Sequence, residues 1–187
     1  MDYFTKSIVG YAERKYQFSK FELAKLKYML EILFLNIVET IVIGAFFIAI
    51  GRTAEFFVAI GVLLSIRNFA GGFHIKRFSL CFVFSAVIFI LVILVLPTID
   101  IMTNGAMEVL LLVSLVINIA LAPVSKRKSA QAPKKRMIYK CISTAIILGY
   151  TLFLLSSEHN PYAAIITWMI FIQTFQLMIG KGMIQHE

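Results

Sequence analysis

Long apolar runs separated by short polar stretches dominate the chain. A helix that spans a membrane needs about 20 apolar residues, and six runs approach or reach that length. They cover residues 30–50, 54–66, 80–96, 106–122, 137–155 and 161–179. Leu, Ile, Val and Phe fill these runs without the alternation of a barrel strand, so the pattern predicts helices. We therefore expect an all-α polytopic membrane protein with about six membrane-embedded helices over 30–179, in a single domain, 1–187.

The composition fits a membrane location. Of the 187 residues, 60% are hydrophobic and 15% are charged, whereas a soluble domain carries about 25% charged residues. A soluble globular domain and a disordered chain are thereby excluded, and two cysteines are too few for a disulfide framework. The first 28 residues carry many charges and lack the apolar core of a cleavable signal peptide. Aromatic and aliphatic residues set among Lys and Arg predict instead an N-terminal amphipathic interfacial helix over 1–28.

The basic residues indicate the orientation in the membrane. With six spans and both termini in the cytoplasm, only Arg52 of the 18 Lys and Arg residues falls in an outward-facing loop. Such a distribution follows the positive-inside rule. The net charge of +8 requires no nucleic acid, because cytosolic loops of membrane proteins face an anionic inner leaflet. The basic run 126–136 anchors the chain to this leaflet, docks an acidic partner, or does both.

The second apolar run, 54–66, is too short to span a membrane before Arg67 interrupts it. It either borrows residues 67–73 or ends as a broken helix that faces a cavity, because irregular backbone in a bilayer must be surrounded by protein or water. Both options bring Arg67 and His74 toward the protein interior. The pair Gly71-Gly72 allows a sharp turn or a close approach of the backbone.

His74 and Cys81 could form a nucleophilic pair. A straight helix would separate them by about 10.5 Å along its axis, whereas a base must come within about 3.2 Å of its nucleophile. His74 must therefore lie in a turn that folds back over the third span. Ser79 as N-cap would place Cys81 in the first helical turn. There the helix dipole and the cations Lys76 and Arg77 would favour a thiolate.

Other interpretations of these residues remain open at this point. A free cysteine is common in an apolar core, and a histidine in a loop is often only solvated. A metal site is not expected, because His74 and Cys81 do not complete a zinc site and His159 and His186 lie far away in sequence. Cys141 has no histidine near it in sequence and is interpreted as structural. Both cysteines are expected on the reducing side of the membrane, so no disulfide is predicted.

The run Arg-x3-Gly-Gly-x-His-x6-Cys, which starts at Arg67 and ends at Cys81, resembles the accessory gene regulator protein B (AgrB) family. These proteins are membrane cysteine endopeptidases of bacterial quorum sensing. The resemblance extends to the chain length, the basic amphipathic N-terminus, the hydropathy pattern and the Lys-rich loop after 122–124. Relatives often read Asn-Lys-Pro in that loop, where this chain reads Lys126-Arg127-Lys128.

The resemblance implies a catalytic pair, Cys81 and His74. Supporting or substrate-binding residues fall on further family-typical positions, namely Arg67, Gly71, Gly72 and Lys76. The implied substrate is an AgrD-like propeptide with an amphipathic leader, a short signal segment and an acidic tail. Cleavage behind the signal segment through an acyl-enzyme thioester, followed by cyclisation, would yield a thiolactone or lactone autoinducing peptide without any cofactor. A third catalytic group stays open among four polar residues, Asn36, Glu39, Gln173 and Gln176.

The expected location is the bacterial cell membrane, with both termini cytoplasmic and the catalytic pair near the cytoplasmic side. The expected partners are the propeptide, the anionic inner leaflet and a second copy of the chain in a homodimer. An alternative is a non-catalytic membrane adaptor or transport component. It is favoured by Glu31, Asn36 and Glu39 in the first span, because ionisable residues inside a membrane often mark a transport path.

Overall fold

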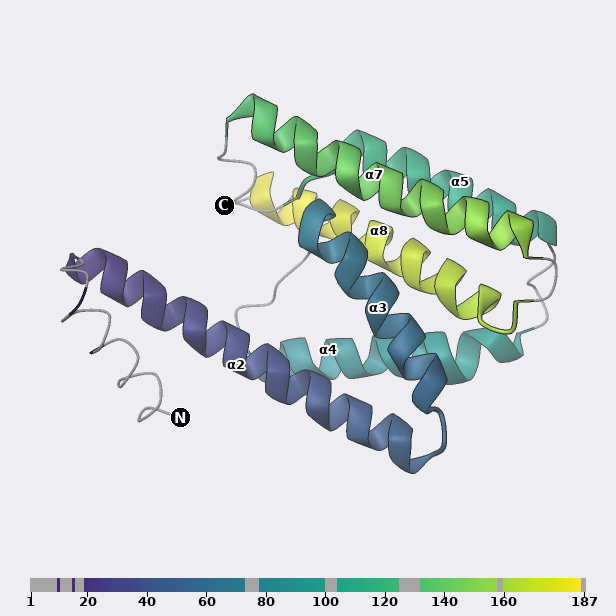
Figure 1. The fold of residues 1–187 in the computed structure, drawn as a ribbon, viewed down its shortest axis with the longest axis horizontal. Coiled ribbons are helices and arrows are strands. Elements are labelled where there is room, and N and C mark those ends of the chain that lie inside the picture. Colours follow the sequence, from purple (N-terminus) through teal and green to yellow (C-terminus); the bar gives the residue numbers. More distant parts are fainter. Residues whose placement is uncertain are drawn as a thin grey trace. The chain divides into compact units, whose positions relative to one another are not determined.

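The computed structural model describes residues 10, 15, 19–72, 78–99, 104–124, 132–157 and 160–185. Helices make up this part of the chain, and no β-strand occurs within it, which confirms the predicted all-α class (Figure 1). The α-helices are α2 (Lys20–Ala49), α3 (Thr53–Ala70), α4 (Phe78–Ile90), α5 (Asn104–Leu121), α7 (Pro133–Ser156) and α8 (Ala163–Gln185).

Five helical stretches are long and apolar enough to cross a membrane. They are Phe21–Ala49, Thr53–Ala70, Leu80–Thr98, Pro133–Ser156 and Ala163–Gly182. The apolar stretch of α5, Gly105–Leu121, is shorter. These six stretches coincide with the six runs predicted from the sequence, and five of them are long and apolar enough to span, which confirms the predicted helical, polytopic architecture.

The chain divides into two compact units, Met1–Gly51 and Arg52–Glu187. In the first unit, α2 begins with a capping box: the Ser19 hydroxyl accepts a hydrogen bond from the Glu22 N–H, and the Glu22 carboxylate accepts one from the Ser19 N–H at 2.9 Å. Such a reciprocal cap satisfies two N–H groups that the helix cannot pair itself. Residues 20–28, expected in the interfacial helix, therefore share one helix with the first apolar run. Most of 1–18 lies outside the described residues.

In the second unit, α3 shows how the short second run is completed. Arg52 donates to Glu55 at 2.8 Å in the first turn, and the helix then continues through Arg67 to Ala70. The helix of the second run thus extends into the residues that follow it, up to Ala70. This was the first of the two predicted options. Gly71 ends the helix with a backbone φ of +85°, a conformation that glycine adopts without the steric cost of a Cβ atom.

The third apolar run forms α4, a π-helical turn over Leu91–Val95 and a 3-10 turn over Leu96–Thr98. Pro97 lies in the 3-10 turn. Proline has no N–H to donate and its ring crowds the preceding turn, which explains why regular helix stops before it, as the sequence predicted.

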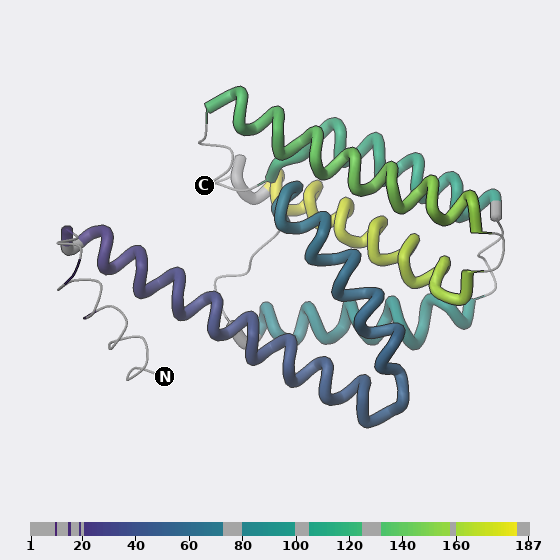
Figure 2. Tube along the Cα trace, viewed as in Figure 1, coloured from purple at the N-terminus to yellow at the C-terminus, as the bar shows by residue number. Residues whose placement is uncertain are grey.

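Helix α8 forms the centre of the second unit and packs against α3, α5 and α7. Figure 2 shows α5, α7 and α8 running alongside one another. The buried face of α8 repeats at helical spacing, with Ile166, Met169, Ile170, Gln173 and Leu177 all less than 5% exposed. Two polar residues on this face, Gln173 and Gln176, lie near the end of α3.

Candidate active site

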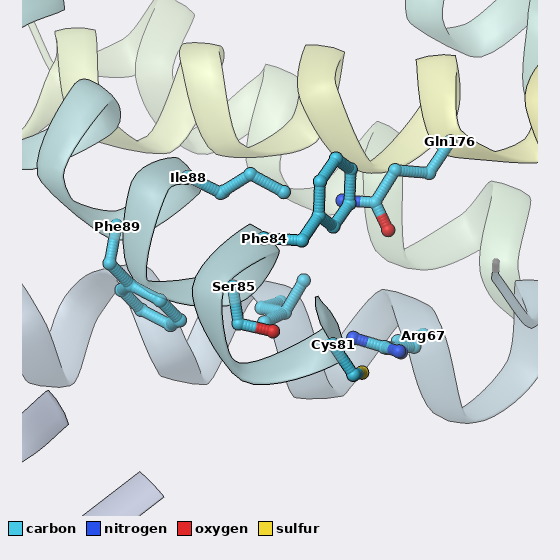
Figure 3. Close-up of a pocket in the computed structure, with 8 residues that line it drawn as sticks. Arg67, Cys81, Phe84, Ser85, Ile88, Phe89 and Gln176 are labelled. Atoms are coloured by element: carbon cyan, nitrogen blue, oxygen red, sulfur yellow. The ribbon is translucent and has the colours of Figure 1, made fainter. Parts of the chain in front are cut away.

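Cys81 is the fourth residue of α4 and lies in its first turn, as predicted. Ser79, the expected N-cap, lies one position inside the helix, because α4 begins at Phe78. The Cys81 side chain is half-buried and lines a narrow pocket between α3, α4 and α8 (Figure 3). The free volume of this pocket is about 10 Å³, so a substrate that reaches Cys81 has to widen it.

The wall of the pocket is mostly apolar, with four polar groups set into it. The apolar residues are Leu63, Phe84, Ile88 and Phe89. The polar residues are Arg67, Cys81, Ser85 and Gln176. Three of the α4 residues, Cys81, Ser85 and Ile88, follow the spacing of one helical face. This spacing was the sequence signal by which Ser85 could have been assigned to the site.

Arg67 and Cys81 lie at the same end of the pocket, whereas Gln176 reaches into it from α8 on the other side (Figure 3). Arg67 is in the last turn of α3, where a positive charge interacts favourably with the helix dipole. The predicted inward position of Arg67 is thereby confirmed. A guanidinium group close to a cysteine stabilises the thiolate, which is the nucleophilic form.

Gly71 and Gly72 join the end of α3 to the segment that follows α5. The Val124 N–H donates to the Ala70 carbonyl at 2.8 Å, and the Gly72 N–H donates to the Val124 carbonyl at 3.2 Å. These bonds form a parallel bridge, here called the Gly71–Val124 bridge. A Cβ atom at Gly71 would collide with the Val124 carbonyl oxygen, so the close approach requires glycine there.

A hydrogen bond from Gln173 connects this bridge to α8. The Gln173 Nε2 donates to the Gly71 carbonyl oxygen at 2.8 Å, and the side chain is fully buried. The Gln173 Oε1 atom is also buried and has no hydrogen-bond partner within the described part of the chain. Three elements that are distant in sequence therefore meet just before residues 73–77.

The structure brings together only part of the predicted site. Arg67 and Cys81 share a pocket, and Gly71 and Gly72 lie directly after the helix that carries Arg67. His74 and Lys76 fall within 73–77, outside the described residues, so the pairing of His74 with Cys81 stays a prediction.

The four polar residues considered as a third catalytic group lie in two different parts of the structure. Gln173 and Gln176 lie at the site on α8, whereas Asn36 and Glu39 belong to α2 in the other compact unit. Cys141 is exposed and does not line the pocket. Among the described residues, no group of three His, Cys, Asp or Glu side chains is arranged to hold a metal ion.

The structure thus defines a helical membrane protein with a cysteine and an arginine in one small pocket. Residues 5–177, nearly the whole chain, match the model of the family described as accessory gene regulator B. The chain belongs to this AgrB family. Membership links the protein to peptide processing in accessory gene regulator quorum sensing. Searches of curated proteins and of solved structures find no match.

Proposed function

We propose that the protein is a membrane-embedded cysteine endopeptidase that cleaves an AgrD-like propeptide behind its signal segment and cyclises the product. The observation that carries the proposal is the position of Cys81: it lies in the first turn of α4 and shares a pocket with Arg67. The other thiol, Cys141, is exposed and lines no part of this pocket. A nucleophilic cysteine needs a nearby positive charge and a site that a peptide can enter.

In the proposed reaction, the Cys81 thiolate attacks the carbonyl carbon of the peptide bond behind the signal segment. The C–N bond breaks, the leaving amine takes a proton from His74, and the signal segment stays bound to Cys81 as a thioester. A Cys or Ser side chain within the peptide then attacks this thioester, and its proton passes to His74 as the Cys81 thiolate leaves. The product is a thiolactone or lactone ring, and Cys81 is regenerated. Because the thioester retains the energy of the acyl group, the ring closes without a cofactor.

The basic residues of α7 support a role in holding the acidic tail of the propeptide. Lys134, Lys135 and Arg136 are exposed in the first turn of α7. Positive charges at a helix N-terminus interact unfavourably with the helix dipole. These three residues therefore do not stabilise α7, and their presence calls for another explanation. In the proposed orientation this turn faces the cytoplasm, beside the anionic inner leaflet, where the tail emerges.

The test is propeptide cleavage by single-cysteine variants in membranes, followed by mass spectrometry. Cys81→Ala is expected to abolish both cleavage and the acyl-enzyme intermediate. Cys141→Ala is the matched control and is expected to retain most of the activity, because Cys141 lies outside the pocket. Cleavage that persists in Cys81→Ala would exclude Cys81 as the nucleophile and with it this mechanism.

A further inference from the structure

Gln176 lines the pocket, and its amide has no hydrogen-bond partner among the described residues. The residue as a whole is 3% exposed, and it faces the pocket. A primary amide among apolar side chains is favourable only when a partner bonds to it. The sequence nevertheless places this amide in an apolar helix, where an aliphatic residue of similar size would fit.

The Gln176 amide points into the pocket that also contains Cys81 (Figure 3). Its helix, α8, packs against α3 and α5, and the next residue, Leu177, is fully buried. The backbone that carries Gln176 is therefore held in place. A polar group fixed in this way is arranged in advance for a ligand that enters the pocket.

The chemistry of a carboxamide indicates the kind of ligand. It offers two N–H donors and one carbonyl acceptor and carries no charge, which complements the N–H and carbonyl of a peptide group. A peptide drawn into an apolar pocket loses its bonds to water and must find new partners. The apolar wall, Leu63, Phe84, Ile88 and Phe89, offers none.

The same helix face already shows this kind of pairing. Gln173, one turn before Gln176, donates from its Nε2 to the main-chain carbonyl of Gly71 at 2.8 Å. The two glutamines therefore differ in their hydrogen bonds. Gln173 donates to the protein's own main chain, whereas Gln176 has no such partner within the described residues.

We propose that Gln176 binds a main-chain peptide group of the substrate next to the carbonyl that Cys81 attacks. This assignment deepens the proposed function and rests on its cysteine nucleophile and peptide substrate. Gln176 is then a substrate-binding residue that aligns the backbone of the peptide from the α8 side, while Arg67 lies at the same end of the pocket as Cys81.

The test compares two thiol reagents on the full-length protein in a Cys141→Ser background, so that only Cys81 reacts. The first is a benzyloxycarbonyl-dipeptide chloromethyl ketone, which contains peptide groups; the thiolate displaces its chloride to form a thioether. The second is methyl methanethiosulfonate, which has no peptide group and transfers a methylthio group with release of methanesulfinate. Gln176→Met should slow the dipeptide reagent about five- to tenfold, the effect of one lost hydrogen bond, and leave the small reagent nearly unchanged.

Thr174→Val is the matched control. Thr174 is also buried on α8, but its hydroxyl bonds to the Ile170 carbonyl of its own helix at 3.0 Å, so both rates should stay unchanged. Equal slowing of both reagents by Gln176→Met, or no slowing of the dipeptide reagent, would overturn the proposal. If the Met variant fails to accumulate, Gln176→Asn decides, because its shorter amide should cause the same selective loss. Neither reagent depends on the propeptide, so this outcome is independent of the Cys81→Ala cleavage test.

Discussion

Replacing Gly71 with alanine should damage both the stability and the activity of the protein. Gly71 has a φ of +85° and a ψ of −155°, a region that residues with a Cβ atom occupy at a cost of about 1–3 kcal/mol. The added Cβ would also meet the Val124 carbonyl oxygen. Relieving that collision pulls apart the two hydrogen bonds of the Gly71–Val124 bridge, which contribute about 0.5–1.5 kcal/mol each.

These terms together predict a loss of about 2–6 kcal/mol of unfolding free energy in Gly71→Ala. For a chain of this size, such a loss lowers the midpoint of thermal unfolding by roughly 4–24 °C. Cleavage should fall roughly tenfold or more even below the midpoint, because the shifted backbone leads directly into the segment before Cys81 and small displacements at a site are costly.

Gly72→Ala provides the comparison. A Cβ at Gly72 would lie 3.4 Å from the Gln173 Nε2 and 3.5 Å from the Arg67 Nε, which is close to ordinary contact, and its φ lies outside the left-handed region. We expect a nearly neutral effect, since alanine also restricts the unfolded chain. The assay is thermal unfolding of both purified variants in detergent, with propeptide cleavage measured in parallel. If Gly71→Ala unfolds at the wild-type temperature, or Gly72→Ala is equally damaged, the reasoning about the bridge is wrong.

Three further predictions address the fold, the orientation and the substrate. Asn118→Leu should lower the unfolding midpoint by the equivalent of about 1 kcal/mol, because the Asn118 amide donates to hydroxyls of α7 at 3.0 and 3.1 Å; an unchanged midpoint would show that these bonds contribute nothing. Reporter fusions after residues 104 and 158 should lie outside the cell and a fusion after 130 inside, as the basic loops require, and a cytoplasmic signal at 104 would contradict six spans. Reversing the charges of Lys134, Lys135 and Arg136 together should weaken propeptide binding more at low salt than at high salt; equal losses at all salt concentrations would indicate misfolding instead.

Most of the fold could be predicted from the sequence, because long apolar runs leave few alternatives in a membrane. The start of α2 could not be placed from the apolar run alone. Charged residues such as Lys25 and Lys27 separated the expected interfacial helix from the first span, but Lys is a good helix former and does not end a helix. The signal that does mark the start is Ser19 followed by Glu22, a capping-box spacing that the structure shows as a reciprocal pair of bonds.

The site was predictable only where it depends on local sequence. Arg67 and Cys81 belong to one motif, and the short second run indicated that Arg67 turns inward, as it does. Gln176 could not be ranked above Asn36 or Glu39, because the distance between α8 and α4 is determined by tertiary packing. Spacing along one helix contains no information about such a distance.

The Gly71–Val124 bridge is made almost entirely of main-chain atoms, and this has a consequence for divergence within the family. The bonds of Ala70, Gly72 and Val124 use N–H and carbonyl groups, which are present whatever the side chains are. These bonds therefore do not depend on which side chains residues 70 and 124 carry. Positions 70 and 124 can therefore change in sequence without loss of the bridge, whereas position 71 requires glycine, because a Cβ atom there would collide with the Val124 carbonyl oxygen.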